Sequence, residues 1–195
     1  MRQGKCWAIA AIVLFGAACG STPTAETSRY LLRGPVVGGV AHTGDAPRLG
    51  VTAVQIPSYL QDDGIVVELA DHEIRHARHH RWAEPLEHGL RHALISALEA
   101  ELGQSVELGP GQARWDERVM VYVEQMHGAV DGDFVFHVGW RVFAEASQSE
   151  RVGRIAVTER LPASGYAALV DMHMAKIGEL ATAIASDVKA LRDAN

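Results

Sequence analysis

Apolar residues recur along this 195-residue chain with two periods, and each period predicts one kind of secondary structure. A spacing of three to four residues predicts two helices, one over residues 84–102 and a longer one from about Ala163 to Leu191. Pro85 suits the first position of the shorter helix, and Gly103 suits the position just past its end. The longer helix carries an apolar stripe made of Tyr166, Val170, His173, Ile177, Leu180, Ile184, Val188 and Leu191. His173 interrupts this stripe, and we expect it to be partly buried and hydrogen-bonded.

Alternation of apolar and polar residues predicts a β-hairpin in the second half of the chain. The alternation runs over residues 119–123 and again over residues 134–142, and Asp131-Gly132 between them is a turn signal. Further extended segments are expected over residues 49–56, 64–69 and 152–158. The order of strands, helix, hairpin, strand and helix, without repeats, predicts an α/β fold in which a mixed sheet carries two main helices.

The first twenty residues have the pattern of an export signal. Two cations precede nine apolar residues, Trp7 to Phe15, and small residues then lead to Cys19. This run is much shorter than the roughly 20 apolar residues of a membrane-spanning helix, so it indicates a cleavable signal peptide. The Ala-Ala-Cys sequence resembles a bacterial lipobox, in which the cysteine is acylated and becomes the mature N-terminus, although Gly16 replaces the usual leucine. An ordinary signal peptide cut nearby is the alternative.

These features divide the chain into a signal peptide (residues 1–18), a lipidated tether (19–28) and one domain (29–195). Bacterial lipoproteins carry three acyl chains on the cysteine, whereas one chain alone would bind a membrane only marginally. In enterobacterial sorting, an aspartate after the cysteine favours retention at the inner membrane. Gly20 stands at that position here, which favours the outer membrane.

Composition excludes one class of function. Removal of residues 1–18 takes two cations with it, lowering Lys plus Arg from 18 to 16 against 24 acids, so the formal charge falls from −6 to −8. An acidic domain is a poor binder of nucleic acid, because phosphate contacts need clustered Lys and Arg. The chain has two cysteines, one in the leader and Cys19, so the mature domain has no disulfide and depends on its core.

The domain resembles a known family in several motifs. Arg29-Tyr30-Leu31-Leu32 forms a tyrosine-leucine strand near the lipidated end, and Pro57-Ser58-Tyr59-Leu60 is followed by an Ile-Val strand. The most specific motif combines His80, Arg81, Trp82, Glu84, Pro85 and Leu86 just before the first helix. In these features the chain is similar to the ABC-type transport auxiliary lipoproteins, the PqiC/YmbA-like family.

The resemblance implies a three-layer α/β fold and a periplasm-facing lipoprotein. It also implies partners, namely an ABC transporter and a mammalian-cell-entry (MCE) domain protein, in a system that moves phospholipid between two membranes. Members of the family are thought to form homo-oligomeric rings that dock onto the MCE partner. No enzymatic activity and no cofactor is implied, and a structural envelope lipoprotein without a transport role is an alternative.

Histidines offer the other candidate chemistry. His72-Glu73-Ile74-Arg75-His76 matches the HExxH signature of zinc hydrolases, which works only on a helix. The segment follows a Val-rich strand, and in an extended segment the two histidines would be about 13 Å apart, too far to share a zinc ion. We therefore expect Glu73 to have no catalytic role and this segment to be extended.

Two further alternatives concern single residues. His88 and His92 lie one turn apart on the first predicted helix and are the best metal pair in the chain, but a solvated helix face with a Glu87–Arg91 ion pair is the preferred interpretation. Trp82 is expected to anchor the entry to that helix by packing inward, although it could instead lie at a subunit contact.

Overall fold

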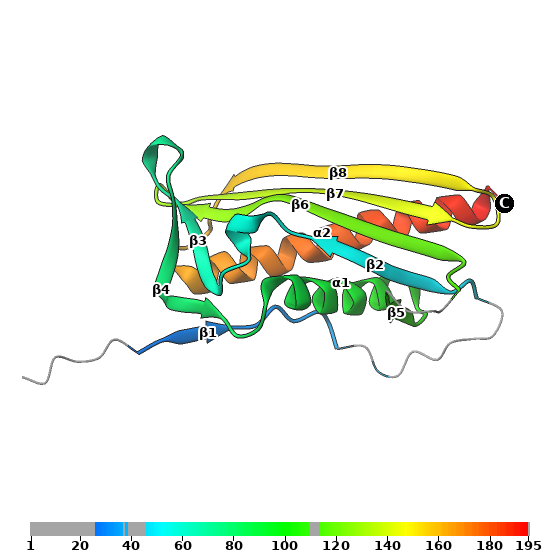
Figure 1. Ribbon diagram of the computed structural model, residues 1–195, viewed down its shortest axis with the longest axis horizontal. Helices are drawn as coiled ribbons and strands as arrows, with labels where there is room; N and C mark the ends of the chain where they lie inside the picture. Colours follow the sequence, from blue (N-terminus) through cyan, green and yellow to red (C-terminus); the bar gives the residue numbers. More distant parts are fainter. Residues whose placement is uncertain (1–25, 37, 39–45, 110–113, 195) are drawn as a thin grey trace, which may run out of the picture.

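The computed structural model describes residues 26–36, 38, 46–109 and 114–194 (Figure 1). The signal peptide, Cys19 and most of the tether lie outside the described residues. In chain order the elements are β1 (Ser28–Tyr30), β2 (Leu49–Gln55), the 3-10 helix η1 (Ser58–Leu60), β3 (Gly64–Glu68), the 3-10 helix η2 (Ala70–His72), β4 (Ile74–Trp82), α1 (Leu86–Leu102), β5 (Val106–Leu108), β6 (Glu117–Ala129), β7 (Asp133–Ala144), β8 (Ser149–Arg160) and α2 (Tyr166–Asp193).

β6 is the central strand of a mixed sheet that has eight strands within the described residues. Along one edge it pairs antiparallel with β7, from Glu117 opposite Ala144 to Gly128 opposite Phe134. Along the other edge it pairs in parallel with β2 and then, near its end, with β3. The sheet continues from β7 to β8, from β3 through β4 to β1, and from β2 to β5. β6 therefore connects every part of the sheet.

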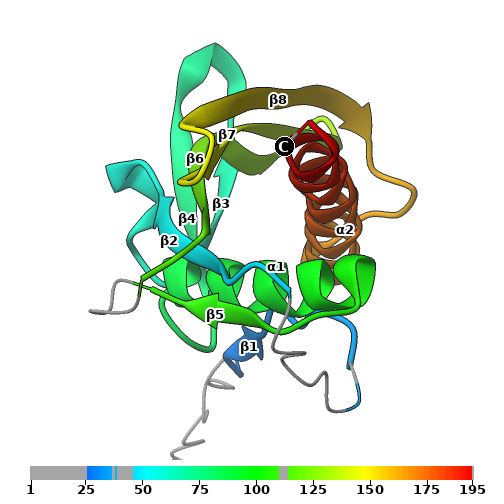
Figure 2. The same ribbon diagram turned by 90° about the vertical axis from the view of Figure 1, so that its right-hand side faces the viewer.

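The core lies between the sheet and the two helices. α1 and α2 pack side by side against the concave face of the sheet (Figure 2). Alternate residues of β6 from Glu117 to Val123 and of β7 from Phe134 to Ala144 are buried in this layer, and so is the stripe of α2 from Val170 to Leu191. Each fully buried aliphatic or aromatic side chain contributes about 1.5–3 kcal/mol, so this layer supplies most of the stability of a domain without disulfides.

The N-terminal segment crosses the helix pair on the side away from the main sheet (Figures 1 and 2). Leu32 is buried, and the backbone N–H of Arg33 donates to Sδ of Met174 on α2 at 3.0 Å. Gly34 lies so close to α1 that an added Cβ would be 2.6 Å from the carbonyl oxygen of Ala93. The residues that follow β1 thus cover part of the helix surface that the main sheet leaves free (Figure 2). None of the helices in the described ranges is long and apolar enough to cross a membrane.

The predicted α/β fold is confirmed, with small differences at the ends of elements. Gly103 ends α1 with a φ of 64°, as its position predicted, and Gly132 makes the hairpin turn with a φ of 94°. Pro85 is the N-cap of α1 rather than its first helical residue, and α2 begins at Tyr166, after Gly165. β8 extends beyond the predicted 152–158, because it pairs with β7 from Ser149 to Arg160.

One substitution tests the close packing between β7 and β8. An added Cβ on Gly153 would lie 2.1 Å from Cζ2 of Trp140, whose Nε1 donates to Oδ2 of Asp187 on α2 at 2.9 Å. Gly153→Ala should therefore displace the indole and lower the free energy of unfolding by about 1–3 kcal/mol, as measured by urea denaturation. Gly139→Ala is the matched control, because the nearest atom to its Cβ would be 3.7 Å away. Equal stability of the two variants would contradict this packing.

Candidate functional site

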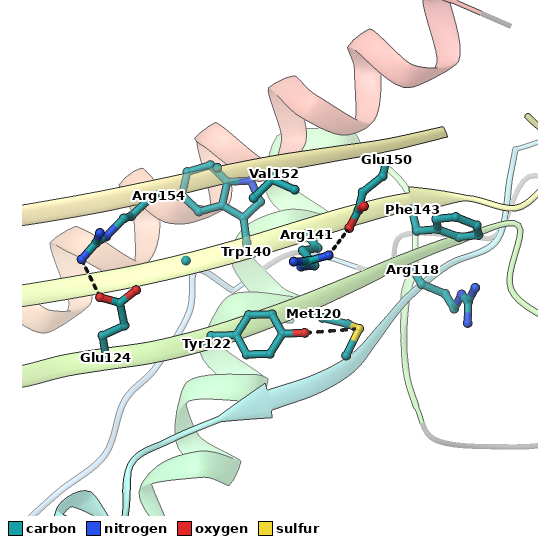
Figure 3. Close-up of a pocket in the computed structure, with 12 residues that line it drawn as sticks. Arg118, Met120, Tyr122, Glu124, Trp140, Arg141, Phe143, Glu150, Val152 and Arg154 are labelled. Carbon is teal, nitrogen blue, oxygen red and sulfur yellow. Dashed lines mark hydrogen bonds and ion pairs between the residues drawn. The ribbon is translucent and has the colours of Figure 1, made fainter. Parts of the chain in front are cut away.

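A shallow groove of about 660 Å³ lies on the outer face of β6, β7 and β8, the face that points away from α2 (Figure 3). The strand register builds it, since residues directly opposite one another form rows across the three strands. One row is Met120, Arg141 and Val152, and the next is Tyr122, Gly139 and Arg154. Gly139 has no side chain and so keeps the floor of the groove low.

The groove is lined by apolar side chains with ion pairs among and beside them. Its apolar lining consists of Met120, Tyr122, Phe143 and Val152, of which Val152 is 65% exposed, and Arg141 lies between Met120 and Val152 in the register. Arg141 is 2.8 Å from Glu150, Arg154 is 2.5 Å from Glu124, and Arg118 is 2.8 Å from Glu145. The guanidinium of Arg118 also lies 4.9 Å from the centre of the Phe143 ring.

This arrangement fits binding better than chemistry. Exposed ion pairs contribute only about 0–1 kcal/mol each to stability, so these pairs are not needed to hold the sheet together. Aromatic residues, Met and Arg are enriched at protein–protein contacts, and all three kinds of residue line this groove. The groove can therefore accept an apolar segment of another protein chain without the need to bury an unpaired charge.

The His80–Leu86 motif joins β4 to α1 and is partly buried within the domain. Trp82 is 4% exposed and packs in the core, as does Leu86. Nδ1 of His80 is 3.0 Å from the Tyr30 hydroxyl, and its ring stacks on Tyr166 at a centroid distance of 4.1 Å. Trp82 is thus buried in the core of the single chain.

The remaining residues of the motif have local roles. Arg81 is 3.0 Å from Asp63, Pro85 caps α1, and Glu84 lies against Gly89 in the first turn of α1. Each of these contacts is within the chain. A contact of Arg81 or Glu84 with another subunit remains a prediction.

The structure separates the histidines of the HExxH segment. His72 ends the short 3-10 helix η2 with a φ of 65°, whereas His76 lies on β4, so the segment is extended rather than α-helical. Nε2 of His76 is 2.7 Å from the carbonyl oxygen of Tyr59, and Nδ1 of His72 is 3.8 Å from Glu68. The geometry required of a zinc hydrolase is therefore not formed by this segment.

His88 and His92 are exposed on α1, next to the expected ion pair of Glu87 with Arg91. Across the described part of the chain, no three His, Cys, Asp or Glu side chains converge as metal ligands would.

Two histidines, His127 and His173, are buried in the domain, and the sequence interpretation had singled out only His173. His173 on α2 is 1% exposed, so it is fully rather than partly buried, and its Nδ1 has no hydrogen-bond partner among the described residues. Burial, with a smaller effect of the nearby His127, lowers the pKa of His173 from 6.5 to about 3. His127 on β6 is itself buried and lies 3.8 Å from Glu68. The only sequence signal was a histidine within an apolar stripe.

Comparison with known proteins identifies relatives along nearly the whole chain. Residues 30–185 match the family model described as ABC-type transport auxiliary lipoprotein component. The chain is 25% identical over 190 residues to the intermembrane transport lipoprotein PqiC of Escherichia coli (strain K12), which covers 96% of this chain and 99% of that protein. A PqiC from Shigella flexneri matches to the same extent.

Solved structures share the fold. The crystal structure of an uncharacterized protein has a TM-score of 0.70 and 23% sequence identity, and it covers 84% of this chain and 99% of its own. The structure of protein XCC0632 from Xanthomonas campestris has a TM-score of 0.68 and 15% identity, over 86% of this chain and 99% of that one. At these identities the likeness concerns the fold alone.

The buried His173 predicts a loss of stability in acid. In the unfolded chain this histidine binds a proton below pH 6.5, whereas in the folded chain it does so only below about 3. Its contribution is therefore intact above pH 6.5 and decreases by up to about 1.4 kcal/mol for each pH unit below it. His173→Leu should make the free energy of unfolding less dependent on pH between 6.5 and 4 in urea denaturation. The exposed His88→Leu serves as the control, and an unchanged pH slope in His173→Leu would refute the assignment.

Proposed function

Because the chain belongs to the ABC-type transport auxiliary lipoprotein component family, we propose that it is a lipid-anchored accessory subunit of an intermembrane phospholipid transport system. Acyl chains on Cys19 hold it at the outer membrane, and the domain faces the periplasm. The family match and the relatives named as intermembrane transport lipoproteins support this proposal. The export signal and the Ala-Ala-Cys sequence support the anchor.

The domain acts as a docking subunit, and the groove on β6–β8 is its contact surface. The observation that carries this proposal is the apolar lining of the groove, with Val152 its most exposed member, on a face of the sheet that neither α1 nor α2 covers (Figures 2 and 3). Its occupant is the MCE-domain partner or a neighbouring copy in a ring. A ring uses two different patches on each subunit, and the groove supplies one of them.

The function is binding rather than catalysis. The zinc hydrolase alternative needs His72 and His76 on one face of an α-helix, whereas here they lie on η2 and β4. A structural envelope lipoprotein without a transport role would have no need for the groove, so loss of groove residues separates that alternative from the proposal.

Substitution of Cys19 tests the lipid anchor. Cys19→Ala should move the protein from the membrane fraction to the soluble periplasm, because no acylated residue then remains. Cys6→Ala is the matched control, since Cys6 lies inside the signal peptide and leaves with it. Fractionation and immunoblotting measure the distribution. A Cys19→Ala protein that stays with the membranes as wild type does would show that the anchor lies elsewhere.

The groove can be tested by the introduction of one charge. Val152→Asp should leave the melting temperature nearly unchanged, because exposed substitutions usually alter stability by less than about 0.5 kcal/mol. It should nevertheless weaken co-purification with the MCE-domain protein or shift the oligomer towards monomer in light scattering. Ala156→Asp is the control, because Ala156 is also exposed on β8, on the same face but outside the groove. If both variants assemble like wild type, the groove is not the contact surface.

A further inference from the structure

The point at which the tether leaves the domain is fixed by β1. Ser28 of β1 lies opposite His80 of β4 in a parallel ladder, so the chain before Ser28 leaves beside Arg78 and His79. The Tyr30 hydroxyl, 3.0 Å from Nδ1 of His80, and the buried Leu32 hold this strand in place. The tether therefore leaves from a defined place at one end of the molecule (Figure 1).

Two arginines flank this exit, Arg29 on β1 and Arg78 on β4, and we call them the exit arginines. Both are exposed, and among the residues that the structure describes neither forms an ion pair. Their neighbours differ, since Arg81 is 3.0 Å from Asp63 and Arg75 is 3.9 Å from Glu73. In a chain whose formal charge is −6, Arg29 and Arg78 are therefore exposed cations whose guanidinium groups are free to meet an external anion.

The tether is short enough to bring this end to a membrane. Ser28 is nine positions after Cys19, and nine residue steps span at most about 30 Å when fully extended. If the acyl chains are on Cys19, the exit arginines cannot be far from the lipid headgroups. Each cation near an anionic membrane surface increases the population of the orientation that brings it there about fivefold. This effect fades within a Debye length of about 8–10 Å.

We propose that the exit arginines bind the anionic lipid headgroups of the membrane that holds the anchor, and so orient the domain with β1 towards the bilayer and the α2 C-terminus away from it. This inference rests on the proposed acylation of Cys19. The outer face of β6–β8, which runs lengthwise between the two ends (Figure 1), then stands upright from the membrane and open to partners.

A single fluorescent label tests the orientation. The mature chain has no cysteine besides Cys19, so one introduced cysteine gives a unique site on the acylated full-length protein in vesicles. Ser164→Cys places the label two residues before Tyr166, which stacks on His80 at the exit, and Ala146→Cys places it in the turn between β7 and β8 at the other end. Energy transfer to labelled headgroups reports how close each label lies to the bilayer.

In vesicles of phosphatidylethanolamine and phosphatidylglycerol, the label at 164 should lie much closer to the headgroups than the label at 146. Arg29→Gln with Arg78→Gln should reduce the oriented population by roughly tenfold or more, and phosphatidylcholine vesicles or high salt should do the same. Arg114→Gln with Lys189→Gln is the matched control, because it removes the same charge near the start of β6 and the end of α2, at the opposite end of the molecule. It should leave the orientation unchanged.

The possible outcomes distinguish failure of the proposed orientation from failure of the proposed acylation. A chain that does not float with vesicles overturns the acylation and this inference with it. A chain that floats but shows equal energy transfer from both labels overturns the inference alone. Equal effects of the exit and control variants would also overturn it, because net charge rather than the exit arginines would then be responsible.

Discussion

The pairing of β6 along both of its edges is the constraint on which the rest of the structure depends. Its backbone hydrogen bonds hold β7 on one side and β2 and then β3 on the other, so all parts of the sheet meet at this strand. Side chains alternate between the two faces of a strand. Once Val119 and Val121 are buried against the helices, Met120 and Tyr122 must point outward. The same register therefore builds the core and the groove.

Much of the fold could be predicted from the sequence, because long amphipathic elements carry a strong periodic signal. α2 and the β6–β7 hairpin are examples. Glycine in the sequence also predicted the end of α1 at Gly103 and the hairpin turn at Gly132, and both residues have a positive φ in the structure. β5 was missed, because three residues held by parallel pairing with β2 have no pattern of their own. β8 was too short in the prediction because it is an edge strand rich in charged residues, which hides its alternation.

The site was harder to predict than the fold, because it depends on contacts between distant residues. The groove exists only when three strands are in register, and nothing in the sequence near Val152 shows that it lies opposite Arg141. His127 and His173 belong to β6 and α2, and they approach one another only after the helix packs on the sheet. The HExxH segment is the opposite case, because its sequence matches a catalytic motif but its backbone is extended and does not form the helix that the motif needs.

The central claim is that the outer face of β6–β8 holds another protein chain in the envelope, and site-specific photo-crosslinking in living cells tests it most directly. A photoreactive residue in place of Val152 should form an adduct with the MCE-domain protein or with a second copy of this chain, and its mass identifies which. The same residue in place of Ala156, exposed on β8 but outside the groove, should give much less adduct. Absence of any adduct from Val152, with strong adducts from positions on α1, would contradict the account.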